Sequence, residues 1–253
     1  MVALNDFAAR LGIPAGSINK LAGYARRCID DYDMIDEGET VAVGLSGGKD
    51  SLSLLCALAE LREYHPKRFR IHALTVHMGF EGVDFTPVHR LCEELDVPYT
   101  LRKTQFGRII FGNGDKKSQC SICAKMRRGA LHDMLGELGI KKIALGHHFD
   151  DAVETFLLSL LYEGRINCFQ PVTYMDRADV TQIRPLLYVK EDALAAFAAL
   201  AALPVVPNPC PLNGASKREE AKRLLKTLEM SYPDIKDKIF RAMQRYPLEG
   251  WGI

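Results

Sequence analysis

The sequence predicts an α/β protein with a doubly wound, mostly parallel sheet. The main observation is that short, β-rich apolar runs alternate with longer runs of helical periodicity, which is typical of βαβ units with helices on both faces of a sheet. The composition agrees, because 47% hydrophobic and 26% charged residues are typical of a folded protein and exclude a disordered one. A chain of 253 residues also buries a large core without a metal or a disulfide.

The alternation begins after an amphipathic helix at residues 17–32, where Leu21, Tyr24 and Cys28 share a face that we expect to cap the sheet. The first four strands of the core are expected at residues 40–45, 70–78, 98–103 and 142–146. The helices that follow them are expected at residues 50–64, 86–95, 123–138 and 150–162.

The second half of the chain adds one strand and a helical end. The strand is expected at residues 180–187, and an alanine-rich helix at 190–203 stops before Pro204. Three prolines and a glycine make residues 206–214 a loop, and two terminal helices are expected at residues 217–229 and 233–246. The predicted organisation is an N-terminal helical segment (1–38), an α/β domain (39–204), and a C-terminal loop with helices packed on that domain (205–253).

Cysteine content and charge limit the possible functions. An odd number of cysteines, seven, together with no secretory leader and no apolar run near 18 residues, predicts a protein of the reducing cytoplasm without a membrane segment. The 33 Lys and Arg residues balance 32 Asp and Glu residues, which excludes a polycation that binds nucleic acid by bulk attraction. A local basic face remains compatible with this balance.

The most informative stretch is a glycine-rich turn between the first strand and its helix. Glycines let the backbone approach an anion, and the start of the helix offers free N–H groups to it. A plain turn with a serine cap is the alternative, but strand, turn, lysine and helix coincide here and favour a phosphate site. The residues of this site are Ser46, Gly47, Gly48, Lys49, Asp50 and Ser51.

The segment SGGKDS resembles the PP-loop signature of the ATP pyrophosphatases, whose spacing differs from the P-loop of kinases. That family cleaves ATP between its α and β phosphates and adenylates a substrate. The resemblance implies that the six residues hold the departing pyrophosphate. It also implies that Lys49, together with Arg127, stabilises charge that develops on the phosphates.

Two further strand ends are expected to face the same crevice. Val76 and His77 lie where the family binds adenosine. Many relatives carry an acidic residue in place of His77, so the expected contact to adenine at this position is made by the backbone. The segment GHHFDDAVET resembles the family motif G-H-x-x-D-D-x-x-E-T. It implies nucleotide contacts by Gly146 and His147 and a Mg²⁺ site. The expected Mg²⁺ ligands are Asp150 and Asp151, unless the pair only caps a helix.

Three cysteines form a candidate cofactor site. Cys120 and Cys123 make a C-x2-C pair, and Cys210 in a proline-rich loop is a third candidate ligand. The pattern C-x2-C-x3-R-R followed by C-P resembles the sulfur-inserting PP-loop branch, the tRNA 2-thiocytidine and 2-thiouridine synthetases. The resemblance implies a 4Fe-4S cluster on these three cysteines with one iron free for sulfide. Asn213 stands near where some relatives carry a further cysteine.

The other four cysteines are expected to be buried packing residues. The role of Cys168 is left undecided, because this residue falls in a loop. Residues 106–118 contain three glycines and are expected to form a mobile lid. An RNA-binding face is expected from clustered basic residues: Arg102, Lys103, Lys116, Lys117, Lys125, Arg127, Arg128, Lys217, Arg218, Lys222, Arg223 and Lys226.

The predicted function is that of an ATP-dependent sulfurtransferase that adenylates a base carbonyl, with tRNA as the expected substrate, and replaces its oxygen by sulfur. The expected cofactors are ATP, Mg²⁺ and a 4Fe-4S cluster. The sulfur donor is expected to be a cysteine desulfurase or free sulfide, and a homodimer is allowed. Two alternatives stay open: an adenylating ligase of the lysidine or amide-forming kind with a structural zinc, and a non-catalytic ATP-binding or cluster-sensing module.

Overall fold

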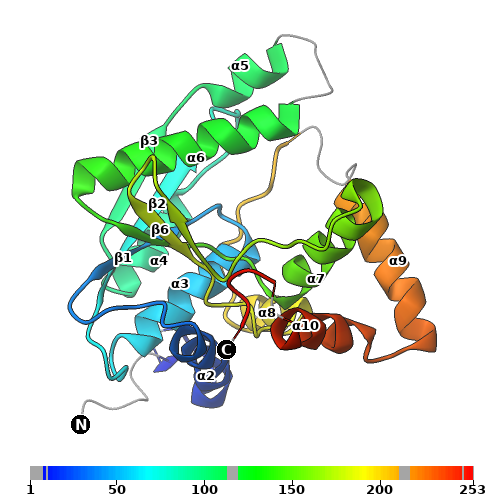
Figure 1. Ribbon diagram of the computed structural model, residues 1–253. Helices are drawn as coiled ribbons and strands as arrows, with labels where there is room; N and C mark the ends of the chain where they lie inside the picture. The colour runs from blue at the N-terminus through cyan, green and yellow to red at the C-terminus, as the bar shows by residue number, and fades with distance from the viewer. Residues whose placement is uncertain (1–7, 10, 113–118, 211–216, 247, 253) are drawn as a thin grey trace.

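The computed structural model describes residues 8–9, 11–112, 119–210, 217–246 and 248–252. Its sheet has helices on both faces, so the doubly wound class is confirmed (Figure 1). The strands are β1 (Thr40–Gly44), β2 (Arg70–His77), β3 (Tyr99–Lys103), β4 (Lys142–Ala144), β5 (Val172–Met175) and β6 (Val180–Ile183). Their order is β3-β2-β1-β4-β6-β5, and every neighbouring pair is parallel except β5 and β6.

The helices are α2 (Ala15–Asp31), α3 (Lys49–Leu61), α4 (Thr86–Glu94), α5 (Phe106–Gly112), α6 (Gln119–Leu138), α7 (Phe149–Leu158), α8 (Glu191–Leu200), α9 (Lys217–Ser231) and α10 (Ile235–Arg245). Side chains alternate between the two faces of a strand, and β1 is an example. Val41 and Val43 pack into the larger hydrophobic cluster with α2, α3 and α8. Ala42 packs into a smaller cluster with Met134 and Leu135 of α6. The sheet is therefore covered by α6 on one face and by several helices on the other.

The fold positions a site where β1 and β4 lie side by side. From β1 the sheet continues through β2 and β3 in one direction, and from β4 it continues through β6 and β5 in the other. At such a switch point the loops leave in opposite directions, and a crevice forms beyond the carboxyl ends of the strands. The glycine-rich turn follows β1, and the segment GHHFDD follows β4, so both reach this crevice.

Three local expectations need correction. Strand β5 was not predicted, because it is a short edge strand whose hairpin turns through Asp179, a non-glycine residue with φ of 49°. Residues 106–112 form helix α5 rather than a lid loop, and residues 113–118 lie outside the described residues. The helix expected at 150–162 continues beyond α7 as a π-helix, Ser159–Glu163, which ends at Gly164 in the left-handed conformation.

The C-terminal helices return to the core beside the site. Helices α9 and α10 both contact α7. Beyond α10, Trp251 is fully buried, and its indole N–H donates to the carbonyl oxygen of Phe169 over 3.0 Å. No helix in the described ranges is both long and apolar enough to cross a membrane.

Candidate active site

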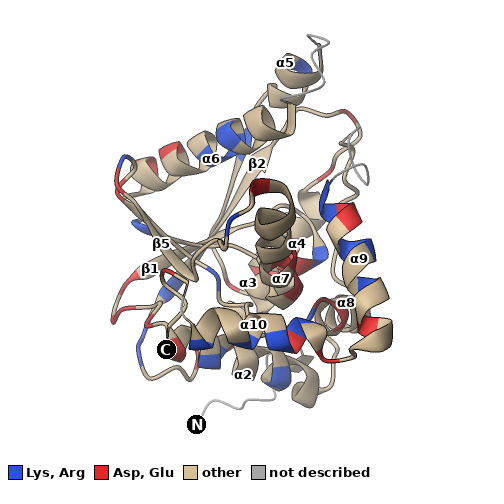
Figure 2. Cartoon of the chain, turned by 45° about the vertical axis from the view of Figure 1, so that its right-hand side comes forward, with Lys and Arg blue, Asp and Glu red and all other residues tan. Residues whose placement is uncertain are grey.

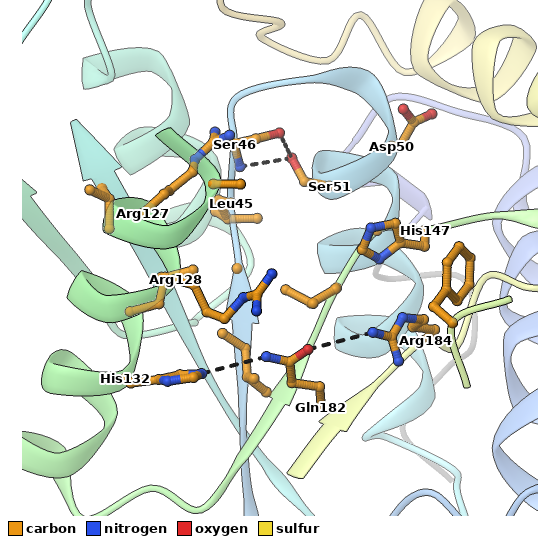
Figure 3. A pocket seen from close by; sticks show the side chains of 18 residues that line it. Leu45, Ser46, Asp50, Ser51, Arg127, Arg128, His132, His147, Gln182 and Arg184 are labelled. Atoms are coloured by element: carbon orange, nitrogen blue, oxygen red, sulfur yellow. Dashed lines mark hydrogen bonds between the residues drawn. The ribbon is translucent and has the colours of Figure 1, made fainter. Parts of the chain in front are cut away.

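The glycine-rich turn is held in one conformation by its own hydrogen bonds. Gly47 has a φ of 84°, and a Cβ atom there would lie 2.8 Å from the Cβ of Val206, so only glycine fits. The Ser51 hydroxyl donates to the Gly48 carbonyl over 2.9 Å and accepts from the Ser46 N–H over 3.2 Å. The Ser46 hydroxyl accepts from the Gly48 N–H over 3.2 Å. The turn is thus preorganised around its two serines (Figure 3).

The start of α3 is available to an anion. Gly48 is the N-cap residue, which has no side chain to cap the helix, so no side-chain cap bond forms there. Uncapped N–H groups and the positive end of the helix dipole bind phosphate well. The geometry therefore fits the phosphate-binding function that the sequence predicts for this turn.

Lys49 lies between two carboxylates beside the turn. Its Nζ atom is 2.9 Å from Oδ1 of Asp50 and 3.1 Å from Oε1 of Glu191, the first residue of α8. Burial would lower the pKa of Lys49, but the two carboxylates outweigh it and raise this pKa. Burial would raise the pKa of Glu191, but Lys49 and Lys222 outweigh it and lower this pKa to about 2. Sequence reasoning missed Glu191, which is 142 residues away from Lys49 in the chain.

The end of β4 packs directly against the glycine-rich turn. A Cβ atom on Gly146 would lie 3.0 Å from the backbone nitrogen of Ser51, so a glycine is needed for this approach. The next two residues have different roles. His148 is the N-cap of α7, where it exchanges hydrogen bonds with Asp151 in a capping box. His147 lines a cavity instead, so the structure places one histidine in the site and uses the other to start the helix.

The acidic pair at the start of α7 lies next to the turn. The His148 ring nitrogens are within 4.0 Å of carboxylate oxygens of Asp50, Asp150 and Asp151. Asp150 also accepts from the backbone N–H of Glu191 over 2.7 Å and pairs with Lys236 of α10 over 3.1 Å. The expected Mg²⁺ ligands are therefore brought together at the phosphate turn.

Helix α9 supplies the counter-charge for the rest of α7. Arg218 lies 2.7 Å from Oδ1 of Asp151 and 3.4 Å from Oε2 of Glu154, whose side chain is only 3% exposed. Lys222 is 3.8 Å from Glu154. Burial raises the pKa of Glu154 to about 7 even though Lys222 and Arg218 act in the opposite direction. The negative charges of Asp151 and Glu154 are thus balanced by cations from a helix that is distant in the sequence.

A central cavity of about 510 Å³ opens beyond the carboxyl ends of β1, β4 and β6, under α6 (Figure 3). Seven residues predicted for the site line it: Ser46, Asp50, Ser51, Val76, Arg127, Gly146 and His147. Arg128, which was predicted for the RNA-binding face, also lines it. Residues that the sequence did not reveal complete the wall, among them His132, Phe169, Gln182 and Arg184. An arginine directly after an apolar strand, as in VTQIR, is the one sequence signal that would have pointed to Arg184.

A second cavity, of about 330 Å³, adjoins the first and contains two of the candidate cysteine ligands. Cys123 and Cys210 line it together with His77 and Arg127. Cys120 is exposed and lies one helical turn before Cys123. We call this space the cysteine cavity.

The candidate ligand thiols of Cys120 and Cys210 influence the thiol of Cys123 electrostatically. Burial raises the pKa of Cys123, Arg127 counteracts it, and the Cys210 and Cys120 thiols raise it further. Among the residues that the structure describes, no three His, Cys, Asp or Glu side chains are already close enough to hold a metal ion.

His77 contributes mainly to local structure. Its Nδ1 atom accepts from the Gly79 N–H over 2.9 Å, and its Nε2 atom is 3.3 Å from the carbonyl oxygen of Val83. Both ring nitrogens are therefore occupied within the turn that follows β2. The backbone at Val76 and His77 still borders the cysteine cavity, and Val76 also lines the central cavity.

The remaining cysteines, Cys28, Cys56, Cys92 and Cys168, are buried. Burial raises the thiol pKa of each of them, to about 12 for Cys56, Cys92 and Cys168. The thiol of Cys168 donates to the carbonyl oxygen of Ala152 over 3.4 Å. All four are thus protonated packing residues, which answers the question that the loop position of Cys168 left open.

Comparisons with known proteins identify the family. The PP-loop domain family matches residues 21–210. The tRNA-cytidine(32) 2-sulfurtransferase of Pelobacter propionicus is 38% identical over 220 residues, covering 86% of this chain and 82% of the relative. The protein of the same name from Syntrophotalea carbinolica is 38% identical over 229 residues, covering 89% and 87%.

A solved structure supports the same assignment. The U34-tRNA thiolase NcsA from Methanococcus maripaludis, determined with its [4Fe-4S] cluster, superimposes with a TM-score of 0.71 at 26% identity. The match covers 91% of this chain and 78% of that one. The expected family is thus confirmed: the chain belongs to the PP-loop proteins, within the group of the tRNA-cytidine(32) 2-sulfurtransferases.

Proposed function

We propose that the chain is an ATP-dependent tRNA sulfurtransferase that adenylates a cytidine carbonyl oxygen and replaces this oxygen by sulfur. One observation carries the proposal: the central cavity and the cysteine cavity share Ser46, Val76 and Arg127 in their walls. A nucleotide on the glycine-rich turn would therefore lie beside the cysteines. Adenylation and sulfur insertion require this proximity, because the second step acts on the product of the first.

The residues of the turn have distinct roles in this reaction. The backbone N–H groups at the start of α3 and the serine hydroxyls would bind the β and γ phosphates of ATP. Asp150 and Asp151 would hold Mg²⁺ on these phosphates, exchanging their present cationic partners for the metal. Lys49 would neutralise charge on the departing pyrophosphate. The base carbonyl oxygen attacks the α-phosphorus, and the bond from this phosphorus to the pyrophosphate breaks.

Arg127 is placed to act in both steps, because it lines both cavities. Its guanidinium would stabilise the charge on the α-phosphate during adenylation and again when AMP leaves. Val76 and Gly146 would contact the nucleotide through their backbone, and His147 would contact it through its ring. In the second step a sulfide sulfur bonds to the base carbon, and the carbon–oxygen bond to AMP breaks.

The cysteines fit a cluster with one iron free of protein ligands. Cys123 and Cys210 face one cavity, and Cys120 precedes Cys123 by one helical turn, which suits three thiolate ligands. A 4Fe-4S cluster on Cys120, Cys123 and Cys210 would supply sulfide bound at that iron. The similar structure of NcsA, which was determined with its [4Fe-4S] cluster, supports a cluster of this type. Asn213 lies outside the described residues.

The finer parts of the proposal concern partners and organisation. The substrate is tRNA, as the names of the relatives suggest. A cysteine desulfurase or free sulfide supplies the sulfur, and the enzyme acts in the cytoplasm. The α/β domain, residues 39–204, carries the ATP site, and residues 205–253 complete it with Cys210, Arg218 and Lys222.

The deciding experiment is iron and acid-labile sulfide analysis of anaerobically purified protein, combined with pyrophosphate release on addition of tRNA. We expect about four irons per chain and a loss of both iron and thiolation in Cys120→Ala. Cys92→Ala, which changes a buried cysteine outside the site, should retain both. One zinc per chain without iron would instead support an adenylating ligase. No pyrophosphate release with any tRNA would support a binding module.

A further inference from the structure

We propose that Arg184 and His147 form a second phosphate subsite on the β4–β6 side of the central cavity, separate from the glycine-rich turn. The subsite takes a phosphoryl group attached to a nucleoside. The proposal rests on the nucleotide function proposed above for the same cavity, and it adds a binding role for Arg184, which follows β6.

Arg184 is a buried cation without a carboxylate partner. Its exposure is 6%, and it forms no ion pair with any residue that the structure describes. All its hydrogen bonds go to uncharged oxygens, in the backbone of Gln170 and the side chains of Thr173 and Gln182. Burying a charge without a counter-charge is costly, because the charge loses its hydration and gains no partner. An anionic ligand in the cavity would remove this cost.

Two buried polar atoms in this part of the wall have no hydrogen-bond partner among the described residues. One is Nε of Arg184 and the other is Nδ1 of His147. Buried donors and acceptors are nearly always paired, so the unpaired Nε–H group adds to the cost of burying the Arg184 charge. Both residues line the central cavity, and Figure 3 shows them on the same side of it.

Phe169 holds both side chains in position. The Arg184 guanidinium lies over its ring at 4.9 Å, and the His147 ring lies 5.0 Å from it at a 40° tilt. Burial and the nearby Arg184 lower the pKa of His147 to about 4, so its ring is neutral at physiological pH. The wall thus presents one fixed positive charge and one neutral imidazole, a pair that matches a phosphate with a single negative charge.

The size of the cavity leaves room for a second phosphate. The glycine-rich turn accounts for pyrophosphate, whereas the cavity of about 510 Å³ extends past Gln182 to His132. The phosphate at Arg184 has two sources with the same chemistry. One is the α-phosphate of ATP, which stays behind as adenylate when pyrophosphate leaves. The other is a phosphodiester of the tRNA.

A purely structural role for Arg184 can be tested, because one variant can remove its hydrogen bond to the β5–β6 hairpin and another can remove its charge. Thr173 belongs to β5 and accepts one of these bonds over 3.0 Å. Thr173→Val removes this bond and leaves the guanidinium in the cavity. Arg184→Gln removes the charge, and Arg184→Lys keeps the charge while losing the fork of donors.

The test measures binding of AMP, pyrophosphate and an anticodon stem-loop RNA to the full chain by isothermal titration calorimetry. We expect Arg184→Gln to weaken AMP binding about 10- to 100-fold and to leave pyrophosphate binding within about twofold. Thr173→Val should leave both unchanged. A loss of RNA binding with unchanged AMP binding would assign the phosphate to the RNA. Unchanged binding of both would overturn the subsite.

Two controls keep the outcomes separate. If Arg184→Gln fails to fold by circular dichroism, Arg184→Met replaces it, because it also removes the charge, and unchanged AMP and RNA affinities in that variant overturn the proposal. If the wild-type chain binds neither AMP nor pyrophosphate, the proposed function fails instead. The subsite alone fails when the wild type binds these ligands and every Arg184 variant binds them equally well.

Discussion

Helices α6 and α9 both carry many basic residues, but these residues have different partners (Figure 2). On α6, Lys125, Arg127 and Arg128 form no ion pair with any described residue. On α9, Arg218 and Lys222 pair with the carboxylates of α7 and α8. One set is free to meet phosphates, whereas the other neutralises the acidic side of the site.

The difference follows from where the acidic residues lie. Residues 119–132 contain no aspartate or glutamate, so the first half of α6 has no intrahelical partners for its cations. Helix α7 begins with two aspartates and carries Glu154 one turn later, and this negative charge attracts cations from α9 and α10. A run of basic residues in a sequence is therefore a poor guide to RNA contacts unless its acidic neighbours in space are known.

The largest effect is expected for a free cation. Arg127→Ala should lower the rate of pyrophosphate release about 100-fold, because it removes a charge that would face the reacting phosphate. Its melting temperature should stay close to that of the wild type, since no ion pair is lost. Steady-state kinetics and thermal unfolding measure both. A clear loss of stability would place Arg127 among the structural cations instead.

Glu154, on the acidic side of the site, should make the free energy of unfolding depend on pH. Its pKa is raised to about 7 by burial, so the folded state binds its proton more tightly than the unfolded state does. The contribution of this group to the free energy of unfolding is greatest below about pH 4.5. It decreases by about 3 kcal/mol as the pH rises to about 7. In Glu154→Gln this fall should vanish. Urea unfolding at several pH values measures this dependence. If the free energy of unfolding changes with pH in the same way in the wild type and in Glu154→Gln, the raised pKa of Glu154 is refuted.

Removal of a cation that forms ion pairs should lower the free energy of unfolding as well as the reaction rate. Arg218→Ala leaves Asp151 and the buried Glu154 without their main partner, and we expect the free energy of unfolding to fall by about 2 kcal/mol. The matched control is Arg223→Ala, which removes an exposed arginine of the same helix and should cost less than about 0.5 kcal/mol. Equal losses in the two variants would contradict the division between paired and free cations.

The smallest effect concerns the salt dependence of tRNA binding. Each phosphate contact contributes about one unit to the slope of log K against log salt. Lys125→Ala and Arg128→Ala should each lower the slope by about one unit, whereas Lys222→Ala should leave it unchanged. Fluorescence titrations across a range of salt concentrations measure the slope. An equal change in the Lys222 variant would mean that α9 also contacts the RNA.

Much of the phosphate site was predictable from short segments. The turn SGGKDS is a strand-to-helix connection whose glycine conformation and helix start depend on neighbouring residues only. The same holds for GHHFDD, where a capping box forms between residues three positions apart. The motif also implied that His147 contacts the nucleotide, and this histidine does line the central cavity. That assignment depends on the direction in which the chain leaves β4.

Residues that complete the site from distant segments were not predictable. Glu191 reaches Lys49 across 142 residues, and Arg184 enters the cavity because β6 pairs with β4. Neither position shows a motif, since an arginine after a strand and a glutamate at a helix start are common. Strand β5 was missed for a related reason: an edge strand of four residues depends on its partner more than on its own propensity.

The chain of 253 residues thus encodes its strands and helices, its glycine-rich turn and its C-x2-C pair locally, because each depends on spacing within a strand, a turn or a helix. The partners of its charges are encoded differently. Arg218 pairs with Asp151, whereas Arg184 has no carboxylate partner in the described part of the chain, and this contrast exists only after the sheet and α9 have assembled. Electrostatic partners are chosen by distance in space, and such distances are set by the packed fold.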